Sequence, residues 1–261
     1  MLLIKKATLG LALSGGGIRG FAHLGVLKVL EEHNIKVDFL AGTSIGAILG
    51  ALYAQGIPVK DIIAITIRIK WSNIIQLPLN ISGISSGEAI EKLLKKYIPH
   101  DSFSKLKIPF SVLVSDLSHG QKLVMNSGNL SLAIRISASF PGIYTPVIKD
   151  EKILCDGGIF CNLPVDITKK MGAKIVVGVD VLPECNMTIK DHNMLNIMDR
   201  SIDLLLKQQP IKHCDLLLKP VTKDIGSLDI ARKFELIDMG EKVARSKLLP
   251  FLKKHGLFPT V

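Results

Sequence analysis

The stretch VDFLAGTSIGAILGALYAQG, residues 37–56, places Ser44 between two glycines at the junction of two different patterns. The apolar run 38–41 that precedes the motif is typical of a short buried strand. The small and apolar residues 44–55 that follow are typical of a helix, and Gly56, with a proline two residues later, supplies a stop signal. A strand, a tight turn and a helix in direct succession indicate one β-α unit of an α/β fold.

Strand and helix patterns alternate along the rest of the chain in the same way. The predicted strands are 8–13, 38–41, 109–117, 121–126, 173–181 and 215–220, together with a hairpin over 146–158. The predicted helices are one that begins at Phe21 and those over 44–55, 88–98, 129–139, 193–207 and 227–248. Ser85 to Glu88 has the form of a capping box, whereas 60–84 predicts a helix followed by an apolar loop. The alternation predicts a single domain over residues 1–261, with an α/β fold and a largely parallel sheet.

The composition is that of a globular protein with a complete core. Apolar residues make up 48% of the 261 residues, which is enough to build a core without disulfides or metals. The cysteines form no C-x-x-C pair and no zinc-finger spacing: Cys155, Cys161, Cys185 and Cys214. We therefore expect reduced thiols, no metal site and no cofactor. Reduced thiols favour a cytoplasmic location.

The formal net charge of +10 predicts attraction to anionic surfaces. The basic residues occur in short clusters, among them Lys5-Lys6, Lys95-Lys96, Lys169-Lys170 and Lys253-Lys254. No nucleic-acid-binding motif accompanies them, and three Tyr and one Trp offer little for base stacking, so we expect no nucleic-acid partner. The charge favours transient, peripheral contact with an anionic membrane, at its inner face for a cytoplasmic protein.

Two apolar stretches invite a membrane interpretation. The N-terminal sequence MLLIKKATLGLALSGGG has its basic pair after the first apolar residues, which is the reverse of a secretory signal. Residues 39–59 carry no charge over about the length of a membrane span. That stretch contains four glycines and a proline, and it divides into a strand, a turn and a helix. We therefore expect it to be a buried strand and helix.

A second glycine-rich turn, SGGGIRG at residues 14–20, joins the first predicted strand to the first predicted helix. Gly15, Gly17 and Gly20 satisfy the dinucleotide-binding pattern G-x-G-x-x-G, but the acidic residue expected at the end of the second strand is absent. Three consecutive glycines at a helix N-terminus present backbone N–H groups to an anion or to a developing oxyanion, and Arg19 adds a positive charge nearby. The loop predicts an anion site or an oxyanion hole, with a ligand-free tight turn as the structural alternative.

The G-x-S-x-G motif around Ser44 stands in the strand-to-helix context of a nucleophile elbow. Its place on the second strand argues against an α/β-hydrolase, and none of the seven histidines lies in a motif that would supply a base. We expect most of these histidines to lie at the surface. Asp156, which a strand delivers to a Gly-Gly turn, is the better base, although such turns also serve structure alone. Asp180 lies within an apolar strand, where a buried hydrogen bond is expected.

Four motifs resemble, in order, those of the patatin-like phospholipase family: LSGGGIRG, GTSIG, SASFPGIYTPV and DGG, within residues 9–165. The resemblance implies a three-layer α/β/α fold and a dyad in which Ser44 is the nucleophile and Asp156 the base. It implies an oxyanion hole and a nucleophile elbow, formed by Gly15, Gly16, Gly17 and Arg19 and by Gly42 and Gly46. Ser137 to Pro141 match a block that shapes the site in the family. Residues 60–110 match no motif and are expected to cover the site.

The sequence leaves three functions open. The first is a serine acyl hydrolase of lipid esters, a phospholipase A or a lysophospholipase, acting on phospholipid or another acyl ester. The second is a regulatory or partner-binding module on the same fold. The third is an anion- or nucleotide-binding module that uses the glycine loop. The lipid headgroup, the acyl chain length and the oligomeric state do not follow from the sequence.

Overall fold

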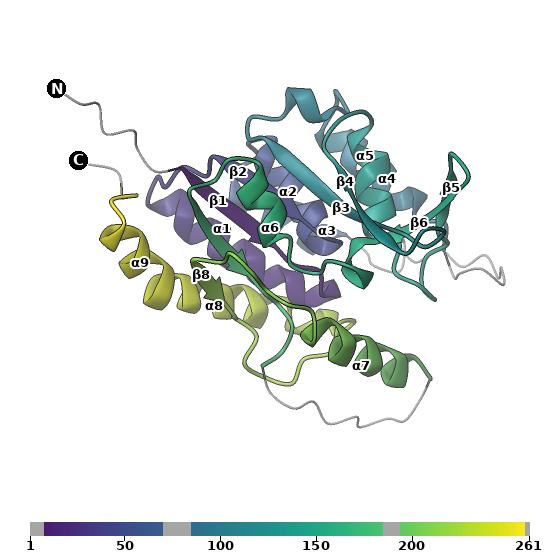
Figure 1. Ribbon diagram of the computed structural model, residues 1–261. Coiled ribbons are helices and arrows are strands. Elements are labelled where there is room, and N and C mark those ends of the chain that lie inside the picture. Colours follow the sequence, from purple (N-terminus) through teal and green to yellow (C-terminus); the bar gives the residue numbers. More distant parts are fainter. Residues whose placement is uncertain (1–7, 70–84, 185–193, 259–261) are drawn as a thin grey trace.

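A mixed sheet of eight strands runs through the residues that the computed structural model describes, 8–69, 85–184 and 194–258 (Figure 1). Its strands are β1 Leu9–Leu13, β2 Phe39–Gly42, β3 Phe110–Asp116, β4 Gln121–Met125, β5 Val147–Lys149, β6 Lys152–Asp156, β7 Ile175–Val179 and β8 Leu216–Leu218. Their order is β5-β6-β3-β2-β1-β7-β8, and β4 also pairs with β3. The pairs β1–β2, β1–β7, β2–β3 and β7–β8 are parallel, which confirms the prediction of a largely parallel sheet.

The central strand β1 lies between β2 and β7. Leu13, its last residue, is in register with Gly42 of β2 and with Val179 of β7. The carboxyl ends of the three strands therefore lie together. The glycine loop, the turn that carries Ser44 and the residue Asp180 follow these ends directly. This is the edge at which open α/β sheets bind their ligands.

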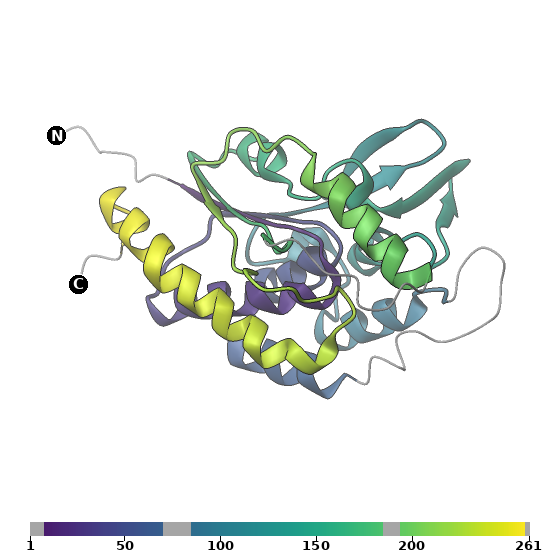
Figure 2. The same ribbon diagram turned by 90° about the horizontal axis from the view of Figure 1, so that it is seen from below.

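Helices cover both faces of the sheet. They are α1 Phe21–Glu32, α2 Ile45–Ala54, α3 Val59–Arg68, α4 Glu88–Tyr97, α5 Leu130–Ser137, α6 Val165–Lys170, α7 Met194–Lys207, α8 Lys233–Val243 and α9 Leu249–Lys254. Figure 1 shows α6 in front of the strands and α1, α2 and α3 behind them. Figure 2 shows the C-terminal helices α8 and α9 on the side of α1. The expected three layers are present, and the layer on the α6 side is the thinner one.

The sheet divides the core unequally. Leu9, Leu11 and Leu13 of β1 belong to the large cluster of buried side chains, which α1, α2 and α8 cover. Ala12 of the same strand belongs to a small cluster that includes Val165 of α6. Alternate residues of a strand point to opposite faces, so β1 presents large side chains to one layer and small ones to the other.

The start of α4 differs from the sequence prediction. Its N-cap residue is Gly87, which has φ 71°, and no side chain caps the helix. The capping box predicted at Ser85 is therefore wrong. A left-handed N-cap favours glycine, because a side chain is strained in that conformation.

The C-terminal helix also differs from the prediction of 227–248. It begins at Lys233 and the chain remains helical to Lys254. A π-helical turn, Ala244–Leu248, precedes Pro250 near the start of α9. Proline lacks an N–H group and clashes with the preceding turn, and the wider π turn allows the chain to pass it.

The membrane interpretation of residues 39–59 is not borne out, because β2 and α2 form within this stretch as predicted. Among the described residues, no helix has both the length and the apolar character needed to cross a bilayer. The predicted apolar loop falls on residues 70–84, which lie outside the described residues, as do Cys185 and His192.

Candidate active site

Ser44 occupies the sharp turn between β2 and α2. Its backbone has φ 54° and ψ −122°, a conformation that costs energy for any residue with a side chain and persists only where the surroundings impose it. The Ser44 N–H donates to Ser137 Oγ at 2.9 Å, and the Ser44 carbonyl accepts N–H groups from the first turn of α2. The half-buried serine is thereby fixed at the carboxyl edge of the sheet.

The two glycines of the motif permit this turn because backbone packs against backbone. A Cβ atom on Gly42 would lie 2.5 Å from the Gly46 carbonyl oxygen. A Cβ atom on Gly46 would overlap the Leu13 carbonyl oxygen at the end of β1. Neither position has room for a methyl group, so both elbow glycines have a steric role.

Asp156 ends β6 and lies beside the same turn. It is 4% exposed, and its Oδ1 accepts the Gly158 N–H at 2.7 Å. Its Oδ2 is buried and has no partner within hydrogen-bond geometry among the described residues. Burial raises the pKa of this carboxyl to about 6, while the Ser44 side chain and the Gly158 N–H lower it. Ser44 is thus close enough to act on the carboxylate without meeting regular hydrogen-bond geometry, as catalytic pairs often are before substrate binds.

The segment that begins at Ser137 positions the serine and the aspartate through their backbones. Ser137 Oγ accepts the Ser44 N–H, and the Ser139 carbonyl accepts the Asp156 N–H at 3.0 Å. Both serines of this segment are buried. A single short segment therefore fixes two residues that are distant in the sequence.

The glycine loop follows β1 at the same edge of the sheet. The Gly15 N–H donates to the Asn162 carbonyl at 3.2 Å and is not free for a ligand. The N–H groups of Gly16 and Gly17 have no acceptor among the described residues. Both glycines line the cavity that contains Ser44. Their N–H groups are the ones available to a developing negative charge.

Arg19 is buried and contacts the glycine loop from the protein side. Its Nε donates to the Gly16 carbonyl at 3.1 Å, and Nη1 and Nη2 donate to the two Asp203 oxygens at 2.6 and 2.8 Å. Asp203 belongs to α7 and is buried as well. The C=O and N–H of one peptide group point in opposite directions. The bond from Arg19 to the Gly16 carbonyl therefore directs the Gly17 N–H away from the guanidinium.

Two amide side chains that the sequence analysis did not single out connect the Asp156 loop to its neighbours. Asn162 Nδ2 donates to the Gly15 carbonyl at 3.5 Å. Gln209 Oε1 accepts the Asn162 N–H at 2.7 Å, and Gln209 Nε2 donates to the carbonyls of Gly158 and Ile159 at 2.7 and 3.1 Å. Gln209 follows α7 in a segment without a motif, so the sequence gives no signal for this role.

His23 is an exception to the prediction that the histidines lie at the surface. It is fully buried in α1, and its Nε2 lies 2.9 Å from the Ser14 carbonyl. Burial lowers the pKa of His23 to about 4, so the neutral ring donates its N–H to that carbonyl. Among the described histidines, none hydrogen-bonds to Ser44 or Asp156. A sequence signal for this burial exists, because the FAHLGVLKVL run of α1 is apolar on most sides.

A cavity of about 570 Å³ opens beside Ser44 and Asp156. Its walls are largely apolar and include Ile48, Leu52, Phe140, Tyr144, Ile202 and Leu206. Three further apolar side chains line it and are 38%, 64% and 49% exposed: Ile159, Leu205 and Leu228. An apolar cavity with a few polar groups at one end suits a ligand with an apolar chain and one polar centre. We call it the ester cavity.

Two other expectations concern residues outside this cavity. Asp180, the alternative acid, is buried and its Oδ1 accepts the Leu182 N–H at 3.1 Å, as predicted. No cluster of three or more potential metal-ligating side chains occurs in the described part of the chain.

The sequence comparisons agree with the order of the motifs. The pattern of the family described as patatin-like phospholipase matches residues 11–169. Patatin-like phospholipase domain-containing protein 6 of Mus musculus is 33% identical in an alignment 185 positions long, which covers 67% of this chain and 13% of that protein. Lysophospholipase NTE1 of Yarrowia lipolytica is 26% identical in an alignment 299 positions long, which covers 99% of this chain and 20% of that protein. The chain thus spans about a fifth or less of the length of these relatives.

A structural comparison adds the fold. VipD from Legionella pneumophila superposes with a TM-score of 0.56 and 12% sequence identity. The match covers 92% of this chain and 67% of that chain. At this identity the likeness concerns the arrangement of strands and helices alone.

Proposed function

This chain belongs to the patatin-like phospholipase family, and from that premise we propose that it is a serine acyl hydrolase of lipid esters, of the phospholipase A or lysophospholipase type. One observation carries the proposal. The strained turn at Ser44 places its side chain beside a buried carboxylate whose Oδ2 has no other partner among the described residues. A carboxyl with a pKa of about 6 is ionised at neutral pH and basic enough to accept a proton.

In the proposed reaction Ser44 Oγ attacks the ester carbonyl carbon while its proton moves to Asp156 Oδ2. The tetrahedral intermediate collapses, and Asp156 returns the proton to the departing alcohol. Water then attacks the acyl-serine and gives a proton to Asp156. As the fatty acid leaves, Asp156 returns that proton to Ser44 Oγ, so one complete turnover restores the dyad and consumes only water.

The glycine loop is the proposed oxyanion hole, with the Gly16 and Gly17 N–H groups as donors. The sequence analysis included Gly15 as a third donor, but its N–H donates to the Asn162 carbonyl and is therefore left out of the proposed oxyanion hole. Loss of one oxyanion donor typically costs about a hundred- to a thousandfold in rate. Arg19 is proposed as a positioning residue, because its guanidinium donates to the Gly16 carbonyl and to Asp203.

The mouth of the ester cavity supports contact with a lipid surface. Leu205 and Leu228 line the cavity and remain about half or more exposed, and the net charge of +10 favours anionic lipid. We therefore propose a cytoplasmic protein that contacts the inner face of an anionic membrane peripherally. Co-sedimentation with vesicles at low salt tests the contact: Leu205→Ser should bind less than the wild type. Equal binding to neutral and anionic vesicles argues against it.

The hydrolase proposal is tested with acyl esters of increasing chain length. The wild type, Ser44→Ala and Asp156→Asn are compared after circular dichroism shows that all three are folded. We expect turnover by the wild type alone, and the preferred chain length indicates whether phospholipids should follow. If folded wild type is as inactive as both variants on every ester and phospholipid offered, the partner-binding alternative gains support.

A further inference from the structure

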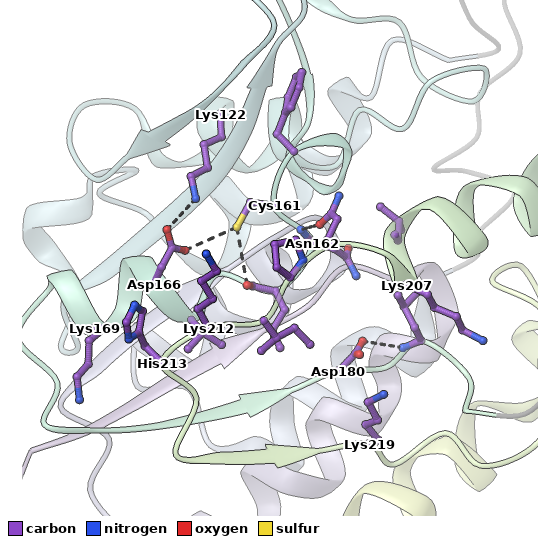
Figure 3. A pocket seen from close by; sticks show the side chains of 18 of the residues that line it. Lys122, Cys161, Asn162, Asp166, Lys169, Asp180, Lys207, Lys212, His213 and Lys219 are labelled. Carbon is purple, nitrogen blue, oxygen red and sulfur yellow. Dashed lines mark hydrogen bonds and ion pairs between the residues drawn. The ribbon is translucent and has the colours of Figure 1, made fainter.

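A second cavity, of about 770 Å³, lies on the α6 side of the sheet (Figure 3). Its lining comes from α6, from the segments that follow β7 and β8, from the end of α7 and from residues 210–213. Both β7 and β8 are parallel to β1, so this cavity also lies at the carboxyl ends of parallel strands. That position is one at which α/β sheets bind small ligands. We call it the lysine pocket.

Lysines from separate segments line this pocket. Figure 3 shows Lys122 and Lys169 on one side, Lys207 and Lys219 on the other, and Lys212 between them. The lining contains six lysines, Lys122, Lys169, Lys170, Lys207, Lys212 and Lys219, and three acids, Asp166, Asp180 and Glu184. Six positive charges against three negative ones leave a surplus of three positive charges, apart from His213.

Most of these lysines have no counter-ion. Lys122 forms an ion pair with Asp166 at 2.7 Å. Lys169 donates to the Lys174 carbonyl at 2.6 Å and lies 3.9 Å from Asp215 Oδ2, a second ion pair. No carboxylate of the described residues lies within ion-pair distance of the other four, Lys170, Lys207, Lys212 and Lys219. Free ammonium groups around a concavity attract anions, and several of them together favour an anion with more than one charge.

The negative charge of Asp180, which also lines the pocket, offsets part of this attraction to anions. It is buried and its Oδ1 is engaged by the Leu182 N–H. Burial raises the pKa of Asp180, while Lys219, Arg19 and Lys207 lower it. The carboxylate therefore balances part of the local positive charge, but it is a single buried charge, whereas Lys170 and Lys212 are exposed.

The lysine pocket is separate from the ester cavity. The wall between the two cavities contains Asn162, Leu206 and Gln209, which line both. The Gln209 side chain accepts the Asn162 N–H through Oε1 and donates to the Gly158 carbonyl through Nε2. The wall is therefore a hydrogen-bonded part of the fold. Neither Ser44 nor Asp156 lines the lysine pocket.

We propose that the lysine pocket binds a phosphate group, carried either by a small soluble compound or by a lipid headgroup. A phosphate group carries up to two charges and several acceptor oxygens, which matches a cavity lined by several lysines better than a single carboxylate does. The proposal does not depend on the hydrolase activity, since no residue of the dyad takes part.

The test measures binding of inorganic pyrophosphate by isothermal titration calorimetry at fixed ionic strength. We expect saturable binding to the wild type and a loss of about tenfold or more in affinity for Lys212→Ala/Lys219→Ala, equivalent to about 1.4 kcal/mol. Lys60→Ala/Lys105→Ala is the matched control, because it removes two exposed lysines outside the pocket and changes the net charge equally. It should bind as the wild type does.

Two results would overturn the proposal: no saturable binding by the wild type, or equal weakening in the pocket variant and the control.

A second experiment, with lipid vesicles, identifies whether the phosphate belongs to a lipid headgroup or to a soluble compound. The same proteins are co-sedimented with phosphatidylcholine vesicles with and without phosphatidic acid. Weaker binding of the pocket variant than of the control to phosphatidic acid supports a lipid headgroup. Equal vesicle binding, with pyrophosphate affinity still lost, supports a soluble phosphate compound.

Discussion

The ester cavity and the lysine pocket share a wall and lie at the same edge of the sheet, but their charged groups differ in sign and in exposure to solvent. In the ester cavity apolar walls surround one buried carboxylate, and burial raises the pKa of Asp156 to about 6. In the lysine pocket most charges are lysines that remain partly or fully exposed. Exclusion of water makes one buried carboxylate more basic in the first cavity, whereas the exposed ammonium groups of the second attract anions through their charge.

Because of this difference, pH and ionic strength should each control a different site. Proton concentration should act on the ester cavity, through Asp156. Ionic strength should act on the lysine pocket, since exposed charges are screened by salt over about 10 Å at 0.1 M. The four predictions below test this separation, beginning with the largest effect.

Asp203→Ala should have the largest effect on stability, and of the two sites it should affect only the ester cavity. It leaves the buried guanidinium of Arg19 without its bidentate partner, and loss of one member of a buried pair costs about 3–5 kcal/mol of unfolding free energy. Ester hydrolysis should fall as well, because Arg19 positions the Gly16 carbonyl. Chemical denaturation and kcat measure the two effects.

The control for this variant is Asp238→Ala, which removes an exposed acid that pairs with Lys242 on the surface of α8. Its denaturation midpoint should match that of the wild type. Below its unfolding midpoint, Asp203→Ala should still bind pyrophosphate. A stability of Asp203→Ala equal to that of the control contradicts the role given to the Arg19–Asp203 pair.

Asp156→Asn should abolish hydrolysis and stabilise the fold at alkaline pH. The folded-state pKa of Asp156 is raised from 3.8 to about 6, so its ionisation is disfavoured in the folded chain. The contribution of Asp156 to the stability of the wild type is therefore complete below about pH 4 and is lost as the pH rises through 6. A shift of about two pKa units corresponds to about 3 kcal/mol. Asparagine stays neutral and retains an acceptor for the Gly158 N–H.

Urea denaturation at pH 4 and pH 8 measures this effect. Asp156→Asn should exceed the wild type in unfolding free energy at pH 8 and approach it at pH 4. A variant less stable than the wild type at pH 8 would show that the carboxylate is not strained by its burial.

Ser137→Ala should have an intermediate effect. It removes the acceptor of the Ser44 N–H, and an unsatisfied polar group in this setting costs about 1–3 kcal/mol. Hydrolysis should fall because the elbow loses one of its restraints. Ser139→Ala is the matched comparison, since its hydroxyl donates only to the Arg135 carbonyl and its own carbonyl still accepts the Asp156 N–H. If both variants lose the same kcat, the Ser137 contact has no special role.

Gln209→Ala should have the smallest effect on kcat, but it should affect both sites. Its amide makes hydrogen bonds with Gly158, Ile159 and Asn162, each worth about 1 kcal/mol. Both kcat for ester hydrolysis and affinity for pyrophosphate should decline modestly. The exposed neighbour variant Gln208→Ala should change neither. An effect of Gln209→Ala on one site alone would mean that the shared wall does not connect the two.

The fold was largely predictable because its signals are local. The β-α unit around Ser44 follows from an apolar run, two glycines and a small-residue helix, and its strand and helix end within one residue of the predicted bounds. The errors concern conformations that local patterns specify weakly. Gly87 replaces a serine as N-cap in a left-handed conformation, and the π turn before Pro250 lets the chain remain helical through a proline.

The contacts that support the site were not predictable because their two partners are remote in the sequence, even where one partner, Arg19 or Ser137, lies in a motif. Arg19 and Asp203 are 184 positions apart, and Ser44 and Ser137 are 93 apart. Neither Asp203 nor Gln209 belongs to a motif. The lysines of the second pocket resemble ordinary surface lysines in the sequence, and only the folded sheet edge brings them together.

The most direct test of the central claim, that Asp156 activates Ser44, is labelling with a fluorophosphonate probe followed by peptide mass spectrometry. It requires no knowledge of the natural substrate. We predict one adduct, on Ser44, formed at a rate that rises as the pH passes through about 6 and reduced to background in Asp156→Asn. An adduct on another serine, or equal labelling of the wild type and Asp156→Asn, would contradict the claim.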